Sequence, residues 1–266
     1  MYRPTGPLAA LVLAAGLSLG ALACSDKITG ISEIRTFTPD RIVSHAALKA
    51  ALTAALVGGN GGLNFPMWAT VVDRAGVVVA VVYSGPSVDD QWLGSRAISA
   101  QKANTANDFS LDAFALSTAN LFSAVQPGGS LYGLQESNPV NPAVVYGGDQ
   151  ARYGTVNDFM VGKKPGGVNV FGGGLALSDA SGEVIGAVGV SGDTSCADHN
   201  IAWRVRDVLG LDHVPGGVDP ASGTDDIIYD ITDDASGHPV SASGFGHPTC
   251  GGTENTFDMP TLYPIS

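Results

Sequence analysis

Basic residues are scarce in this sequence: 13 Lys and Arg stand against 25 Asp and Glu among 266 residues, a formal net charge of −12 at pH 7. A surface of this sign repels the phosphates of nucleic acids and of anionic lipid headgroups. We therefore exclude nucleic acid as a partner and expect membrane attachment only through a lipid anchor. Charged residues make up just 14% of the chain and hydrophobic residues 44%, which is enough for one compact core.

The sequence also lacks several motifs that mark metal and phosphate sites. It contains no H-E-x-x-H pair, no C-x-x-C pair and no EF-hand loop. Gly172-Gly173-Gly174 lacks the Lys-Ser/Thr ending of a phosphate-binding loop and precedes a predicted strand instead of a helix. The acidic stretch 225–234 is a candidate for calcium, but its spacing fits no defined loop, so we interpret it as a solvated acidic segment.

A long hydrophobic run is found at the N-terminus. Arg3 is the only charge in residues 1–23, and the apolar run 8–22 ends in small residues before Cys24. This pattern is typical of a signal peptide. It also resembles a bacterial lipobox, in which Cys24 would be lipidated, although the same small residues suit simple secretion. Without its single Arg the mature chain has 12 basic and 25 acidic residues, a net charge of −13. The sequence predicts an extracytoplasmic protein, either a periplasmic or cell-surface lipoprotein or a secreted one.

Only three cysteines are present. If Cys24 is consumed by processing, Cys196 and Cys250 remain in an oxidising compartment, which favours a disulfide. The bridge would tie the C-terminal part of the chain to the start of a predicted helix. The alternatives are two unrelated thiols or a pair of metal ligands.

Hydrophobic periodicity and turn residues predict an alternation of helices and hairpins. The segment Thr38-Pro39-Asp40 is typical of a helix start. The predicted elements are a helix over 38–57, a hairpin of strands 67–73 and 77–83, helices over 91–108 and 111–125, a hairpin within 169–192 that turns at 179–182, and a helix over 195–209.

This order predicts an α+β fold, with helices packed on an antiparallel sheet. The expected organisation is a signal peptide (1–23), a tether (24–37), one domain (38–210) with a long loop at 128–170, and an irregular C-terminal extension (211–266) packed on the domain. A loop of that length inside a compact domain is usually functional.

Three segments carry a family resemblance: Ala69-Thr-Val-Val-Asp-Arg-Ala-Gly76, Lys102-Ala-Asn-Thr-Ala106, and Gly186-Ala-Val-Gly-Val-Ser-Gly192 with Asp198 and Ala202 beyond it. In this order and spacing they resemble the GlcG/HbpS family, a haem-binding or haem-degrading-like domain also found at the C-terminus of PduO-type proteins. The resemblance covers about residues 40–210. The segment 133–142 and the cysteine-bearing tail extend beyond the minimal domain and indicate a longer, secreted branch.

The resemblance implies a profilin-like fold, a five-stranded antiparallel sheet flanked by helices, assembled as a homo-oligomer. It also implies haem as the cofactor. The preferred hypothesis is a haem (tetrapyrrole)-binding protein for capture, buffering or sensing. The alternatives are an enzyme that degrades haem or acts on another small anionic molecule, and a structural or partner-binding module without a ligand; no catalytic residue is assigned.

Three side chains are candidates for the haem site. Neutral imidazole is a common axial ligand of haem iron, so His45 and His199 are the candidate metal ligands. Otherwise His45 is a core-edge residue bonded to a backbone carbonyl, and His199 is a surface residue facing solvent or a cleft. Lys102 could bind a haem propionate, or form a structural ion pair with Asp73 or Asp198.

Two further features have structural interpretations. Asp198 points into the predicted buried face of its helix and needs partners there, so we expect it to accept backbone amides from the turn at 189–192. Lys163 and Lys164 are adjacent bases in the long loop, and we expect them to be solvated.

Overall fold

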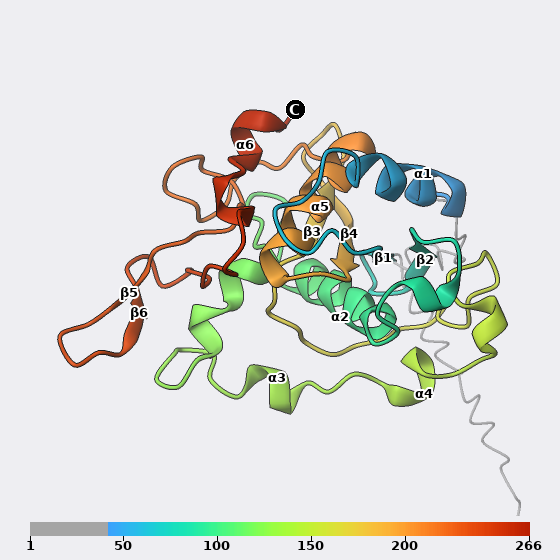
Figure 1. Ribbon diagram of the computed structural model, residues 1–266, viewed down its shortest axis with the longest axis horizontal. Coiled ribbons are helices and arrows are strands. Elements are labelled where there is room, and N and C mark those ends of the chain that lie inside the picture. The colour runs from blue at the N-terminus through green and yellow to red at the C-terminus, as the bar shows by residue number, and fades with distance from the viewer. Residues whose placement is uncertain (1–41) are drawn as a thin grey trace, which may run out of the picture. The chain divides into compact units, whose positions relative to one another are not determined.

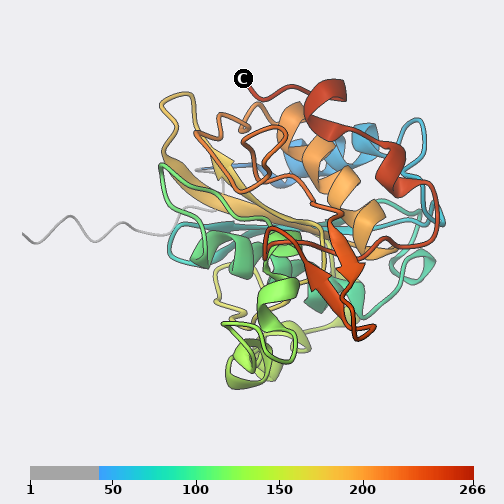
Figure 2. The same cartoon turned by 90° about the vertical axis from the view of Figure 1, so that its left-hand side faces the viewer.

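A computed structural model describes residues 42–266, which form one α+β domain (Figures 1 and 2). The signal peptide, Cys24 and the tether lie outside the described residues. Among the described residues no helix is both long and apolar enough to span a bilayer.

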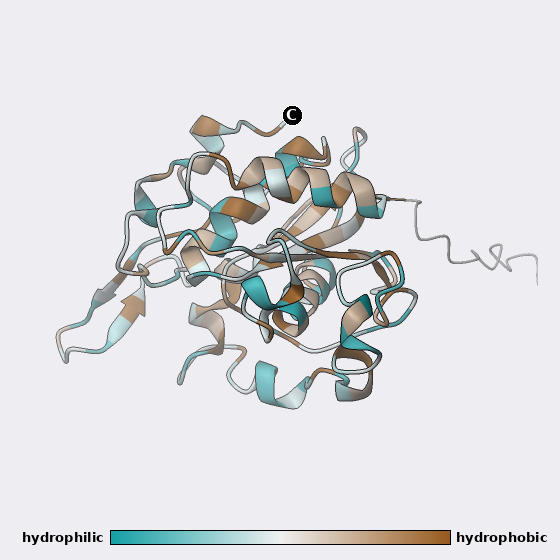
Figure 3. Cartoon of the chain, turned by 45° about the vertical axis from the view of Figure 1, so that its right-hand side comes forward, coloured by the Kyte–Doolittle hydropathy of each residue, from teal (hydrophilic) through white to brown (hydrophobic). Residues whose placement is uncertain are grey.

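The centre of the domain is a four-stranded antiparallel sheet with strand order β2-β1-β4-β3. Strands β1 (Trp68–Asp73) and β2 (Val78–Tyr83) form the first predicted hairpin, and β3 (Gly174–Ser178) and β4 (Val184–Ser191) form the second. The hairpins join through β1 and β4, with Val71 opposite Val188. Because both faces of the sheet are covered, the strands are apolar almost throughout, as their brown and white colours show (Figure 3).

Helices cover the sheet on both faces. Helices α1 (His45–Ala55) and α5 (Ser195–Val208) pack on one face through Leu48, Leu52 and Ile201, whereas α2 (Ser95–Asp108) packs on the other through a row of alanines. The close approach of α2 requires glycine on the sheet, because a Cβ at Gly189 would lie 2.0 Å from the Ser99 carbonyl oxygen. Two glycine-punctuated hairpins and their helices therefore form the predicted three-layer arrangement.

The connections between the main elements and the C-terminal extension contain only short elements. They are the 3₁₀ turns η2 (Val88–Asp90), η3 (Thr118–Leu121), η4 (Ser123–Val125) and η5 (Gln150–Arg152), the single-turn helices α3 (Leu134–Ser137) and α4 (Pro142–Val145), the small hairpin of β5 (Ile231–Asp233) and β6 (Pro239–Ser241), and η6 (Glu254–Thr256) with α6 (Met259–Leu262).

Some sequence expectations are corrected. The main sheet has four strands instead of five, and β5 and β6 form a separate two-stranded sheet. The predicted helix over 111–125 is replaced by η3 and η4. Ser110, directly before this predicted helix, accepts the N–H of Leu116 (3.1 Å) through its hydroxyl, while Leu111 and Phe114 pair across a tight turn. These contacts fold the chain back before a continuous helix can begin.

Two helices also start later than predicted. Helix α1 begins at His45, because the Ser44 hydroxyl accepts the N–H of Ala47 (3.1 Å) as an N-cap; Thr38, the expected cap, lies outside the described residues. Helix α2 begins at Ser95 instead of 91, because the Gln91 side chain donates to the carbonyls of Ser87 and Val88 and closes a separate turn.

Candidate functional site

The turn between β4 and α5 is fixed by Asp198. This side chain accepts the N–H groups of Gly192 (3.0 Å) and Asp193 (2.9 Å) through Oδ1. Thr194 caps the helix by accepting the N–H of Ala197 (3.3 Å). The expectation that Asp198 accepts backbone amides of the glycine-rich turn is therefore confirmed, and the donating N–H groups extend one residue beyond the expected segment, to Asp193.

Lys102 holds the other oxygen of Asp198. Its Nζ lies 2.7 Å from Asp198 Oδ2 and 3.1 Å from the Val190 carbonyl oxygen, and its side chain is 1% exposed. Burial lowers the pKa of Lys102 and raises that of Asp198 to about 6, whereas their mutual attraction opposes both shifts. Of the two partners considered from the sequence, Lys102 pairs with Asp198 and not Asp73. Contact with a haem propionate would require this pair to open.

His199 is fully buried, so the expectation of a surface residue facing solvent or a cleft is wrong. Its Nε2 lies 3.0 Å from Asp226 Oδ1, and its ring packs near Trp203. Asp226 belongs to the C-terminal extension, which covers this side of α5. The extension also buries Asp225, which forms two hydrogen bonds with Arg206 (2.8 and 2.9 Å). The first part of the acidic stretch is thus internal and paired instead of solvated. The proposed role of His199 as a metal ligand stays a prediction.

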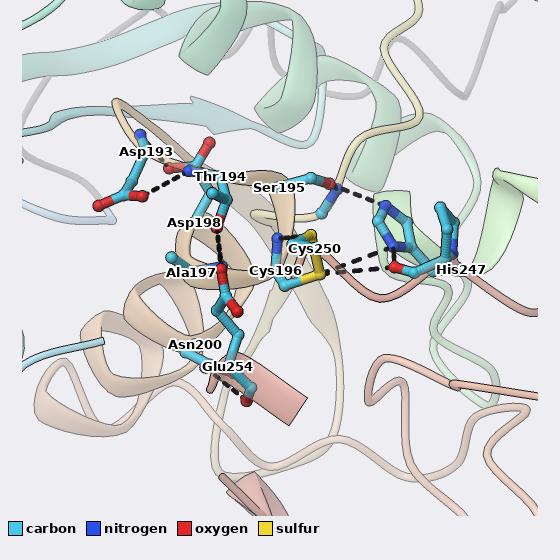
Figure 4. Close-up of a disulfide and its surroundings, with 12 residues drawn as sticks. Asp193, Thr194, Ser195, Cys196, Ala197, Asp198, Asn200, His247, Cys250 and Glu254 are labelled. Carbon is cyan, nitrogen blue, oxygen red and sulfur yellow. Dashed lines mark hydrogen bonds between the residues drawn. A yellow bond between two sulfur atoms is a disulfide. The ribbon is translucent and has the colours of Figure 1, made fainter. Parts of the chain in front are cut away.

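The C-terminal extension is anchored over the start of α5 (Figure 4). Cys196 and Cys250 form the predicted disulfide. Beside it, Ser195 Oγ lies 2.8 Å from His247 Nε2, and the Thr194 hydroxyl donates to Glu254 (2.6 Å). Sequence reasoning did not single out Ser195, His247 or Glu254. The sequence offered one signal for these residues: each lies within four positions of a cysteine of the predicted disulfide, so the disulfide brings them together.

His247 is neutral in this position. Its Nδ1 lies 2.7 Å from the carbonyl oxygen of Pro248, and since that oxygen only accepts, Nδ1 carries the proton and Nε2 accepts from the Ser195 hydroxyl. Burial lowers the pKa of His247 to about 4. The ring also packs against Phe122, at 5.1 Å between centroids.

His45 is half-buried at the first position of α1. Its Nε2 lies 2.8 Å from the carbonyl oxygen of Gly154 in the long loop. The carbonyl accepts, so in the neutral ring Nε2 is the donor and Nδ1 keeps a lone pair. A histidine whose second nitrogen donates to a carbonyl has the arrangement usual for metal ligands. The alternative of a core-edge histidine bonded to a carbonyl describes the same contact, so this geometry is compatible with both interpretations.

A cavity lies beside the C-terminal half of α1, about two turns beyond His45. Lys49 lies one turn after His45, donates to the carbonyl of Tyr83 and sits 5.0 Å from the centre of that ring. Thr53, two turns after His45 and roughly 12 Å along the axis, lines a cavity of about 320 Å³ together with Phe65 and other residues. Phe65 packs edge-on against Trp92, which is 53% exposed. His45 and Lys49 lie on the earlier turns of α1 and do not line this cavity.

The three cofactor-binding residues predicted from sequence do not share a contact. His45 bonds the long loop, Lys102 pairs with Asp198, and His199 bonds the C-terminal extension. Of the three, His45 alone is part of an open surface. Lys164 is exposed as expected, whereas Lys163 is only half-exposed and lies 3.6 Å from the Phe159 ring centre.

These features define an α+β domain with a braced glycine-rich turn, a half-buried histidine at the start of α1 and a cavity beside the end of that helix. The chain belongs to the haem-degrading protein HbpS-like family, whose sequence model matches residues 43–206. The family resemblance inferred from the three motifs is confirmed. A Citrobacter freundii relative, an uncharacterised 15.0 kDa protein of the dhaT–dhaS intergenic region, is 34% identical over 145 residues, covering 54% of this chain and 77% of the relative.

Solved structures with similarity to the chain include Klebsiella pneumoniae protein ORFY, with 29% identity, a TM-score of 0.42, and coverage of 63% of this chain and 90% of that chain. A second is the PduOC–haem complex, with 25% identity, a TM-score of 0.42, and coverage of 61% and 89%. A third is a double mutant of Streptomyces reticuli HbpS, with 16% identity, a TM-score of 0.41, and coverage of 76% and 99%.

Proposed function

We propose that this protein binds haem outside the cytoplasm and serves in its capture, buffering or sensing. Membership of the haem-degrading protein HbpS-like family supports haem as the ligand. The observation that carries the proposal in this chain is the contact between His45 Nε2 and the Gly154 carbonyl, which leaves Nδ1 with a lone pair at the surface.

Groups that suit haem lie along α1 and at the cavity beside its C-terminal half. Phe65 and Trp92 offer aromatic edges to an apolar macrocycle. Lys49 lies between His45 and the cavity and supplies positive charge for a propionate. The cavity of about 320 Å³ falls at the lower end of small-molecule sites, roughly 300–1,000 Å³, so we expect haem to lie partly embedded with one edge in solvent.

The test is a titration with haemin followed by its Soret absorption. We expect a shifted Soret band with one haem per chain, lost in His45→Ala and weakened in Lys49→Met. The matched control is His238→Ala, since the side chain of His238 is 77% exposed and lies far along the sequence in the β5–β6 hairpin. An unchanged spectrum at micromolar haemin, or a band that survives His45→Ala, would contradict the assignment.

Haem degradation is the second candidate, and the family description favours it. Here the chain would hold the substrate while reductant and oxygen are supplied from solution. Loss of the Soret band only when both are added, with formation of a bile-pigment-like product, would support an enzyme. A stable Soret band under those conditions would favour storage or sensing.

Localisation and assembly complete the proposal. The disulfide supports an oxidising compartment. We propose that Cys24 carries a lipid anchor and that the protein is a homo-oligomer. Lipid labelling that is lost in Cys24→Ser tests the first point, and the molar mass from light scattering tests the second; an unlabelled wild-type chain would indicate simple secretion.

A further inference from the structure

The disulfide lies beside a third side chain that binds metals. Cys196, His247 and Cys250 each offer one ligand atom, and these atoms all lie within 4.8 Å of one another. Within residues 42–266 this is the single group of three or more metal-type donors so close together. Two thiolates with one imidazole form a ligand set that zinc and other soft divalent ions prefer.

We propose that reduction of the Cys196–Cys250 disulfide converts this cluster into a site for one zinc-type ion, with Cys196, His247 and Cys250 as ligands. A dithiol gives the disulfide two electrons and two protons and becomes a disulfide itself; a phosphine gives two electrons and becomes a phosphine oxide, and water supplies its oxygen and the two thiol protons. The ion then displaces the two thiol protons. The established family membership assigns no such site, and the proposal is independent of haem binding.

The separations of the donor atoms support this site. Bonds of about 2.3 Å to sulfur and 2.0–2.1 Å to nitrogen in a tetrahedron place a sulfur and a nitrogen ligand roughly 3.5 Å apart. His247 Nδ1 already lies 3.9 Å from Cys196 Sγ. The sulfurs must separate from 2.07 Å to roughly 3.8 Å by the same geometry. Cys250 can supply that movement, because it is half-exposed in an irregular segment.

The surroundings suit negatively charged sulfur and a ligating imidazole. Cys196 occupies the first turn of α5, where backbone N–H groups favour negative charge, and its own N–H lies 3.1 Å from Cys250 Sγ. When Nδ1 binds the ion, it gives up its hydrogen bond to the Pro248 carbonyl oxygen (2.7 Å). The proton moves to Nε2, and the contact with Ser195 Oγ at 2.8 Å reverses, so that Nε2 donates and the hydroxyl accepts. Ser195 would then orient the ring as a neighbouring acceptor commonly does for ligating histidines. Three protein ligands leave the fourth position open to water.

The experiment uses the full chain with Cys24→Ser, so that the third cysteine contributes no thiolate. The protein is compared in its oxidised form and after reduction with a phosphine and anaerobic desalting. Cobalt(II) serves as the spectroscopic probe, and zinc affinity is measured by competition with a chromophoric chelator. We expect thiolate-to-cobalt charge-transfer bands and one bound ion per chain only after reduction.

The matched variant is His247→Gln, which retains hydrogen-bonding capacity without imidazole. It should weaken zinc binding by 10-fold or more while both thiols remain. Equal binding by the oxidised form, or unchanged affinity in His247→Gln, would overturn the proposal. Circular dichroism and tryptophan fluorescence monitor folding: native spectra with zinc bound support the site, and a reduced chain that is unfolded with and without zinc would refute it.

Discussion

Lys102 and Asp198 form an ion pair enclosed between α2 and the first turn of α5, with Nζ 2.7 Å from Oδ2 and side chains 1% and 3% exposed. The two residues are 96 positions apart in the sequence, and their pairing fixes the turn that starts α5. Removal of one member leaves the other charge buried without its partner, which is costly.

We therefore expect Lys102→Met and Asp198→Asn each to lower the free energy of unfolding by about 3–5 kcal/mol. The double variant should lose less than the sum of the two, because it buries no unpaired charge. Urea denaturation measures the free energy of unfolding of the two single variants and the double variant. Lys164→Met is the control and should match the wild type, because Lys164 is exposed. Strict additivity of the two single effects would contradict direct coupling.

Removal of the disulfide should destabilise the domain. Cys196 and Cys250 are 54 residues apart, and the chain-entropy model gives about 4 kcal/mol for a loop of this length. We expect Cys196→Ser/Cys250→Ser to lose about that much relative to a chain with all other residues unchanged. Equilibrium denaturation under non-reducing conditions provides the measurement, and a loss below about 1 kcal/mol would show that the other contacts of the tail suffice.

Acid should destabilise the protein partly through His247. Its pKa is about 4 in the folded chain, below the ordinary value of 6.5. The unfolded chain therefore binds the proton more readily between pH 6.5 and pH 4, and stability falls as the pH falls through that window. This histidine lowers the free energy of unfolding by at most roughly 1.4 kcal/mol for each pH unit within that window.

The check is the difference in unfolding free energy between the wild type and His247→Gln at several pH values. We expect the wild type to lose more stability than the variant on acidification, while the opposite contribution of Asp198, whose pKa is raised, is common to both chains. Parallel pH profiles would show that His247 does not carry this dependence.

Arg96 should control the mobility of the long loop. Its guanidinium bonds both oxygens of Asp158 and the Val145 carbonyl, and its Cζ lies 3.7 Å from the Tyr153 ring centre. Lysine cannot reproduce this planar set of contacts. We expect Arg96→Lys to accelerate limited proteolysis within residues 146–162 several-fold. Arg152→Lys, an exposed position in the same loop, is the control and should cleave at the wild-type rate.

Filling the cavity beside α1 should weaken haem binding and leave the stability of the domain unchanged. Thr53 is exposed at the rim of the cavity. We therefore expect the indole of Thr53→Trp to occupy the cavity and to change the free energy of unfolding by less than about 0.5 kcal/mol. If haem lies there, its affinity should fall at least 10-fold while thermal unfolding stays the same. Retention of full affinity would place haem elsewhere on the protein.

Local patterns predicted much of the fold correctly. Both hairpins, the helix from Ser195 and its termination at Gly210, whose φ is 61°, follow from short-range turn and capping chemistry. The role of Asp198 was predictable because a carboxylate on a buried helix face needs nearby donors. The disulfide was predictable because, once Cys24 was assigned to the predicted N-terminal processing signal, only Cys196 and Cys250 remained to pair.

The remaining features depend on contacts between distant segments. His199 is buried by Asp226, and Arg206 is paired with Asp225, yet neither contact leaves a periodic signal in the sequence. The segment 111–125 has the composition of a helix. However, the Ser110 hydroxyl accepts the backbone N–H of Leu116, and this contact turns the chain away from a helical path. His45 is held by the carbonyl of Gly154, which is 109 residues away in the sequence.

The position of Cys250 near the end of the chain means that the core can form before the disulfide does. All four strands of the main sheet and helix α5 are complete by residue 208, so the layered core can assemble while the chain is still being synthesised. Cys196 must remain a thiol until its partner, 54 residues later, has emerged. Chains interrupted before that point would present an unpaired thiol beside an uncovered helix start, and thiol-reactive reagents would distinguish them from finished molecules.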